Sequence, residues 1–155
     1  MTLAARLAAL TWIGGSLIAM NAPANAPTLA ASGVELRAAR LEAFFEAHGC
    51  PRPFLVDEYV DAADRNQLDY RILPAVSVLE STCGVYARLN NRWGWDSART
   101  GFRSVARGIR FIAHQLAFGR YYQGKNVDQK LRIYNPKNPN YASEVKRLML
   151  EIDGD

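Results

Sequence analysis

The sequence predicts a single, mainly α-helical domain of five to six helices. Apolar residues recur at helical spacing in most segments after residue 35, and no segment shows the alternation of a half-buried strand. The chain has 155 residues, of which 49% are hydrophobic and 22% are charged, so it is long and apolar enough to bury one real core. This composition excludes a disordered protein.

Residues 1–31 have the features of a secretory signal peptide. Their only charge, Arg6, precedes the apolar segment Leu7–Met20, and small residues typical of a cleavage region follow. The alternative is a retained membrane anchor, but this apolar segment is shorter than the roughly 20 residues that a membrane span needs. We therefore expect export to the periplasm or the cell exterior, no stable membrane insertion after cleavage, and a functional domain over residues 35–155.

The exported chain is expected to be mildly basic. The whole chain has 19 basic and 15 acidic residues with a net charge of +4, and residues 1–31 contain one basic residue and no acid, which leaves 18 − 15 = +3. A charge this small does not indicate a nucleic-acid partner. It suits a protein that meets an anionic polymer such as a bacterial cell wall.

Two amphipathic helices are expected before residue 70. The first covers Glu35–Ala47 and stops at Gly49. Its large apolar side chains are Leu36, Leu41, Phe44 and Phe45. The second covers Phe54–Asn66, with apolar residues on one face and most charges on the other.

The next helix is expected over residues 70–83, with Asp69 as its N-cap and Gly84 just past its end. Apolar residues surround it on nearly every side, so we expect it to be central to the domain. Pro74 indicates either a kink or a late start.

Glu80 is the most informative residue of this helix because it is the only charge after a continuous apolar run. On a helix it shares a face with Leu73, Val76 and Cys83. The negative end of the helix dipole and partial burial both raise the pKa of such a carboxyl, which suits a general acid. The alternative is an ordinary solvated glutamate.

Three further helices complete the prediction. Ser104 would cap a helix that runs to Phe118 and closes at Gly119. The others are Val127–Ile133 and Tyr141–Ile152.

Cys50 and Cys83 are the only cysteines, and in an exported chain they are expected to form a disulfide. Two buried free thiols are the alternative. The two histidines, His48 and His114, do not stand at metal-ligand spacing from a cysteine, so no metal site is expected.

The sequence around Glu80 resembles a known family. Leu68–Val76, leading to Glu80 and Ser81, is similar to the opening of lysozyme-like domains that cleave peptidoglycan, the lytic transglycosylases and glucosaminidases. Asn90–Trp95 resembles the loop that follows the acid in glucosaminidases, and Phe102–Leu116 resembles their next helix.

Later elements extend the resemblance to about residues 54–153. Tyr134-Asn135, followed by Tyr141 and Val145, is similar to late elements of transglycosylases. The resemblance implies a lysozyme-like fold and cleavage of glycan strands between N-acetylmuramic acid and N-acetylglucosamine units. It also implies Glu80 as the catalytic acid and no cofactor.

The resemblance further implies a set of substrate-binding residues around Glu80. These are Ser81, Asn90, Asn91, Trp93, Trp95, Tyr134, Asn135 and Tyr141. The tryptophans would offer flat faces to sugar rings, the asparagines would bond hydroxyl and acetamido groups, and either tyrosine would orient the acid. The alternatives are loop packing for the tryptophans and helix anchoring for the tyrosines.

The second catalytic group stays unassigned. Asp96 is the only acid between Glu80 and Asp128, and a solvated loop position is the expected role for it. We therefore expect non-hydrolytic cleavage that leaves 1,6-anhydro ends, with hydrolysis as the alternative. The rival functions are a non-catalytic wall-binding or scaffold protein and a basic protein that attacks membranes.

Overall fold

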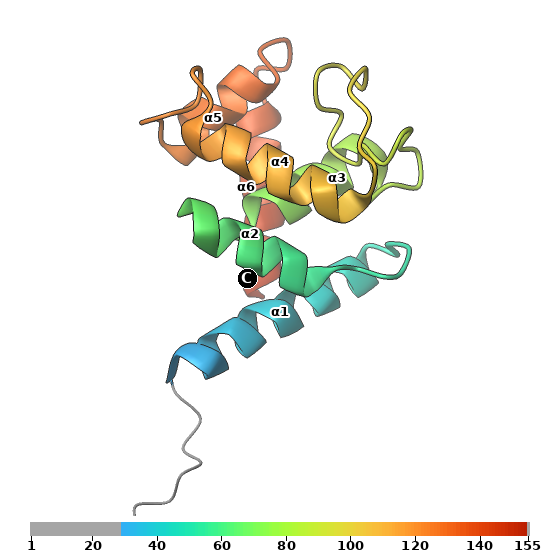
Figure 1. Ribbon diagram of the computed structural model, residues 1–155, viewed down its shortest axis with the longest axis vertical. Helices are drawn as coiled ribbons and strands as arrows, with labels where there is room; N and C mark the ends of the chain where they lie inside the picture. The colour runs from blue at the N-terminus through green and yellow to red at the C-terminus, as the bar shows by residue number, and fades with distance from the viewer. Residues whose placement is uncertain (1–28, 155) are drawn as a thin grey trace, which may run out of the picture.

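The computed structural model describes residues 29–154, and this part of the chain forms six helices without a strand (Figure 1). They are α1 (Leu29–Ala47), α2 (Val56–Asn66), α3 (Ile72–Ser81), α4 (Val105–Phe118), α5 (Val127–Tyr134) and α6 (Tyr141–Asp153). The mainly α-helical prediction is therefore confirmed. Residues 1–28 of the expected signal peptide, which was predicted over residues 1–31, lie outside the described residues, and residues 29–31 belong to α1.

The helices stack in an order that differs from their order in the sequence. In Figure 1, α1 lies at the bottom, α2 crosses above it, and α4 crosses above α2. Side-by-side packing joins α1 to α2 and α2 to α4, while α6 packs against α1, α3 and α5. In the described part of the chain, no helix combines the length and the apolar character that crossing a membrane requires.

Helix α3 is buried along most of its length, as its apolar sequence predicts. Every residue from Ile72 to Ser77 is buried. The helix starts late, so that Pro74 falls in its first turn, where the missing N–H breaks no helical hydrogen bond.

The predicted caps of α3 were wrong in detail. The Asp69 carboxylate accepts hydrogen bonds from the backbone N–H and side chain of Arg71 and does not cap the helix. The helix ends at a left-handed turn at Thr82 and Cys83, before Gly84 is reached. The caps of α4 are as predicted, because Ser104 Oγ accepts from the Arg107 N–H at 3.2 Å and Gly119 closes the helix.

Helix α1 is longer than predicted, since it begins at Leu29 and not at Glu35. Its second half supplies Leu41, Phe44 and Phe45 to the core. Leu36, which belongs to the predicted apolar set, is 54% exposed because the first half of the helix extends beyond the helices that cover its second half (Figure 1).

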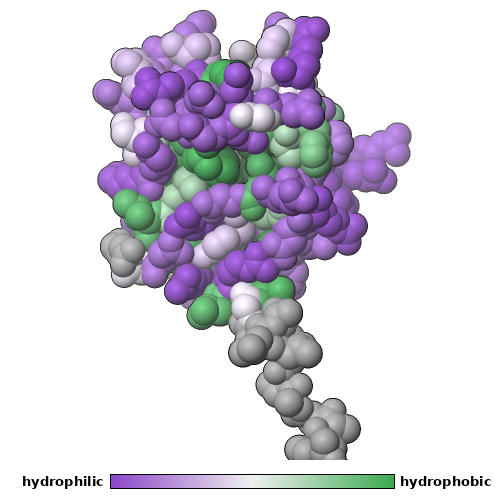
Figure 2. All heavy atoms as spheres, turned by 90° about the vertical axis from the view of Figure 1, so that its left-hand side faces the viewer, coloured by the Kyte–Doolittle hydropathy of each residue, from purple (hydrophilic) through white to green (hydrophobic). Residues whose placement is uncertain are grey.

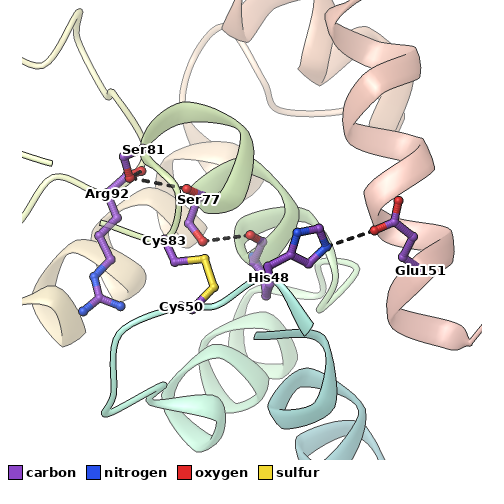
Figure 3. The surroundings of a disulfide bond; sticks show 8 residues. His48, Cys50, Ser77, Ser81, Cys83, Arg92 and Glu151 are labelled. Carbon is purple, nitrogen blue, oxygen red and sulfur yellow. Dashed lines mark hydrogen bonds and ion pairs between the residues drawn. A yellow bond between two sulfur atoms is a disulfide. The ribbon is translucent and has the colours of Figure 1, made fainter. Parts of the chain in front are cut away.

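Two links attach the end of α1 to the rest of the domain (Figure 3). The expected disulfide joins Cys50, just after α1, to Cys83, just after α3, with the Cα atoms 5.4 Å apart. His48 Nε2 lies 2.9 Å from Glu151 Oε2 on α6. The end of the helix that carries Glu80 is therefore tied covalently to the α1–α2 connection.

Much of the face drawn in Figure 2 is hydrophilic. On the face drawn in Figure 2, hydrophobic side chains gather in the middle, between hydrophilic upper and lower parts.

Candidate active site

Glu80 lies in a cleft of about 640 Å³ near the end of α3. The rest of the wall comes from the loop between α3 and α4, the turn after α4, and the end of α5 with the segment that follows it. These parts contribute Gly94, Trp95, Asp96, Ser97, Thr100, Tyr121, Tyr122, Tyr134, Asn135, Pro136 and Lys137.

A single close hydrogen bond orients the Glu80 carboxyl. Tyr141, the first residue of α6, donates from its hydroxyl to Glu80 Oε1 at 2.7 Å. Within residues 29–154, no lysine, arginine or histidine forms an ion pair with this carboxyl. Burial raises the pKa of Glu80 above its ordinary value, and the hydrogen bond from Tyr141 partly opposes that rise. The raised pKa favours the protonated form that a general acid needs.

The neighbouring tyrosines remain protonated hydrogen-bond donors. Burial and the negative charge of Glu80 raise the pKa of both Tyr141 and Tyr134 far above the ordinary tyrosine value. Their rings stack with centroids 5.9 Å apart and planes inclined by 6°. Of the two tyrosines that the sequence offered as partners of Glu80, Tyr141 is the one in contact.

Tyr134 and Ser81 hold consecutive carbonyl groups of the loop that faces Glu80. Ser81 Oγ donates to the Arg92 carbonyl at 2.6 Å, and the Tyr134 hydroxyl donates to the Trp93 carbonyl at 2.7 Å. The next residue is Gly94. The two bonds therefore set the position of Gly94 against the acid.

Gly94 lies directly beside the Glu80 carboxyl. Its φ is +63°, and a Cβ placed on it would stand 2.7 Å from Glu80 Oε2. A side chain at this position would occupy the space beside that oxygen.

Asn91 supports the same loop from inside. It is buried, its Oδ1 accepts from the Trp95 N–H at 3.0 Å, and its Nδ2 donates to the carbonyls of Trp95 and Thr100. Asn90 lies outside the cleft, where its Nδ2 donates to the Phe102 carbonyl at 2.9 Å. Both asparagines thus bond to loop backbone.

The two tryptophans of the loop occupy different environments. Trp93 is 0% exposed and its Nε1 donates to the Leu73 carbonyl, so it has no face to offer to a sugar. Trp95 lines the cleft and contacts the rings of Phe111, Tyr122 and Tyr134 at centroid distances of 6.0, 6.1 and 5.7 Å. The expectation of a sugar-facing surface therefore fits Trp95 and does not fit Trp93.

Asp96 also lines the cleft, and it is the only carboxylate besides Glu80 among the lining residues. Its oxygens contact Arg99 Nη2 at 2.5 Å and Thr100 Oγ1 at 3.2 Å. The hydrogen bond from Arg99 lowers the pKa of Asp96, whereas the pKa of Glu80 is raised. Of the two carboxyls in the cleft, Glu80 is therefore the one that keeps its proton to higher pH.

The expected residues thus fall into three groups. Glu80, Trp95, Tyr134 and Asn135 line the cleft, whereas Ser81, Asn91, Trp93 and Tyr141 lie behind it and position what lines it. Asn90 does neither, because it lies outside the cleft. Seven lining residues were not expected from the sequence, namely Gly94, Ser97, Thr100, Tyr121, Tyr122, Pro136 and Lys137. A signal for the tyrosines existed, because Tyr121-Tyr122 is an aromatic pair directly after the end of a helix at Gly119.

No group of three or more histidine, cysteine, aspartate or glutamate side chains gathers around a metal-sized space in residues 29–154. The donor atoms of the cleft are a carboxyl pair, hydroxyls, an amide and one lysine. This set fits a polar organic ligand with hydroxyl groups.

Comparisons of the chain with models of protein families, with curated proteins and with solved structures find no match.

Proposed function

We propose that this protein cleaves the glycan strands of peptidoglycan, with Glu80 as the general acid. One observation carries the proposal. A carboxyl with a raised pKa, oriented by a tyrosine hydroxyl and without a basic partner in the described residues, faces a cleft of about 640 Å³ lined by aromatic and hydroxyl side chains. Breaking a glycosidic bond requires a proton delivered to the leaving oxygen, and such a carboxyl is suited to supply it.

In this proposal the two oxygens of Glu80 have different tasks. Tyr141 donates to Oε1, so the transferable proton belongs on Oε2, beside Gly94. Protonation of the glycosidic oxygen breaks its bond to the anomeric carbon, which becomes electron-deficient. Glu80 is then a carboxylate and acts as the base for the next step.

The cleft walls suit a chain of sugar rings. Trp95 and Tyr122 offer aromatic faces to the apolar side of a pyranose ring. Ser97, Thr100 and Asn135 offer donors and acceptors for hydroxyl and acetamido groups.

The arrangement favours ring closure over hydrolysis as the second step. In ring closure, Glu80 takes the proton of the sugar's own 6-hydroxyl, whose oxygen bonds to the anomeric carbon and forms a 1,6-anhydro end. The nucleophile is then part of the substrate and needs no second carboxylate. Hydrolysis with two carboxylates is the alternative, and Asp96 would be the second group.

Export belongs to the same proposal. A disulfide between Cys50 and Cys83 fits an oxidising compartment, where peptidoglycan is also found.

The test is a digest of purified peptidoglycan with wild type, Glu80→Gln and Asp96→Asn, followed by mass analysis of the products. Glu80→Gln keeps the shape of the side chain and removes the proton, so we expect cleavage to be lost while the thermal unfolding midpoint stays near that of wild type. Wild-type turnover by Glu80→Gln would refute the assignment.

Product masses decide the second step. Anhydro products are one water lighter than hydrolysed fragments, and we expect them from wild type and from Asp96→Asn alike. Reducing ends, lost in Asp96→Asn, would establish hydrolysis with two carboxylates.

A non-catalytic wall-binding or scaffold function is the second candidate. It is favoured by the ion pair between Asp96 and Arg99, which engages the only other carboxylate of the cleft. Wild-type protein that leaves peptidoglycan intact but sediments with it would support this candidate.

A further inference from the structure

A second hollow, of about 610 Å³, lies along the exposed side of α4 and carries positive charge. Its lining is Gly101, Phe102, Arg103, Arg107, Arg110, Phe111 and His114. No aspartate or glutamate is among these residues, so the groove, which we call the arginine groove, has no internal counter-charge.

Two of the three arginines in the groove form no ion pair with an acidic side chain of the described residues. Arg110 forms an ion pair with Glu58 on α2. By contrast, Arg103 and Arg107 form no ion pair with any acid in the part of the chain that the structure describes, although most other arginines there do. A guanidinium presents a planar fork of donors that matches a carboxylate.

The arginine groove adjoins the Glu80 cleft across a wall of aromatic rings. Trp95 lines the cleft, and its ring meets the ring of Phe111 edge-on at 6.0 Å. Phe111 lines the groove and is 41% exposed, and its ring centroid lies 5.6 Å from that of Phe102, which also lines the groove. A group attached to a polymer in the cleft therefore reaches the hollow that Arg103 and Arg107 line by passing over Trp95 and Phe111.

We propose that the arginine groove binds the carboxylates of the short acidic peptides that branch from the glycan strand in the cleft. The inference rests on the proposed function, because peptidoglycan is the polymer that carries both parts. Arg103 and Arg107 pair with the peptide carboxylates, and the exposed part of Phe111 packs against apolar peptide side chains. The protein would therefore prefer strands that still carry their peptides over bare glycan.

The test compares the affinity of two soluble glycan fragments, one with its peptides and one from which an amidase has removed them. Calorimetry with Glu80→Gln protein avoids cleavage during the measurement. The groove variant adds Arg103→Gln and Arg107→Gln to this background. The control adds Arg65→Gln and Arg132→Gln, which change the net charge equally on α2 and α5, where both arginines are exposed.

We expect the Glu80→Gln protein and the control to bind the peptide-bearing fragment more tightly than the bare one. In the groove variant, the affinity for the peptide-bearing fragment falls by about fivefold or more, since two charge pairs are lost, and the ratio of the two affinities approaches one.

Four outcomes overturn the inference. If the groove variant keeps the ratio of the two affinities that the Glu80→Gln protein shows, Arg103 and Arg107 do not bind the peptides. If the control loses as much affinity for the peptide-bearing fragment as the groove variant does, the loss is a general effect of net charge. If the Glu80→Gln protein binds both fragments equally, the groove inference fails while the proposal for the cleft stands. If it binds neither fragment, both proposals fail together.

Discussion

Gly94 lies against the carboxyl of Glu80, at a distance where a Cβ would stand 2.7 Å from Oε2. Two independent constraints therefore select glycine here. The backbone has φ +63°, a value that residues other than glycine rarely adopt. In addition, the Glu80 carboxyl occupies the space that a Cβ on Gly94 would need. The first constraint concerns the backbone, and only the second concerns the chemistry.

Gly94→Ala separates these two effects when it is compared with Gly49→Ala. Gly49 has the same φ of +63°, but a Cβ there meets nothing within 4 Å. We expect both variants to lose about 1 kcal/mol of unfolding free energy, as alanine does at positive φ. Only Gly94→Ala should lose cleavage, by about 100-fold, because it displaces the acid. Equal activity in the two variants would show that the contact with Glu80 is not needed.

Tyr141→Phe should change the pH dependence of cleavage. The Tyr141 hydroxyl stabilises the Glu80 carboxylate and so lowers a pKa that burial raises. Without that hydroxyl the pKa of Glu80 rises further, and the acid keeps its proton to higher pH. The limb on which the rate falls with increasing pH should therefore move upward, while the maximal rate drops because the acid is less well oriented.

Tyr121→Phe is the control for that measurement. Tyr121 also lines the cleft, but its hydroxyl contacts Arg120 and not Glu80. Its pH profile should match wild type. If the pH–rate profile of Tyr141→Phe also matches wild type, Glu80 is not the group whose titration controls cleavage.

The two loop tryptophans should respond differently to alanine. Trp93 fills the core, so Trp93→Ala should lower the unfolding free energy by about 3–5 kcal/mol in denaturant titrations. Trp95→Ala should weaken the binding of glycan fragments by about 2- to 10-fold, the range expected for one aromatic contact, with a smaller loss of stability. Unchanged glycan binding by Trp95→Ala would place the sugar rings elsewhere.

Removing the disulfide should lower stability without removing the catalytic group. The bridge between Cys50 and Cys83 spans 33 positions, and the loop-entropy model gives about 4 kcal/mol for such a closure. The Cys50→Ala/Cys83→Ala variant should therefore unfold at lower urea concentration, and a reducing agent should shift wild type to the same midpoint. A reducing agent that leaves the wild-type midpoint unchanged would show that the thiols are already free.

Much of the helical framework could be predicted from the sequence because local signals mark it. Ser104 and Gly119 delimit α4, and Glu80 is conspicuous as a charge at the end of an apolar run. The start of α1 could not be predicted, since Leu29 stands in a segment that also resembles a signal-peptide cleavage region.

The arrangement of the loop between α3 and α4 could not be predicted from local sequence patterns. Trp93 and Trp95 are the same residue type and stand two positions apart. No repeating pattern of apolar residues in the loop shows that Trp93 is buried and that Trp95 lines the cleft. Their orientation depends on bonds from distant residues, namely those of Ser81 to Arg92 and of Tyr134 to Trp93. Single-sequence patterns do not contain such long-range pairings.

The bond between Tyr141 and Glu80 also has a consequence for biosynthesis. The acid is on α3, its neighbouring loop follows, and its hydrogen-bond donor begins α6, close to the C-terminal end of the described chain. A contiguous fragment that holds the complete constellation must extend at least from Glu80 to Tyr141. A nascent or truncated chain that ends before α6 has the carboxyl of Glu80 without its orienting hydroxyl, so the assembled site exists only after nearly the whole domain has folded.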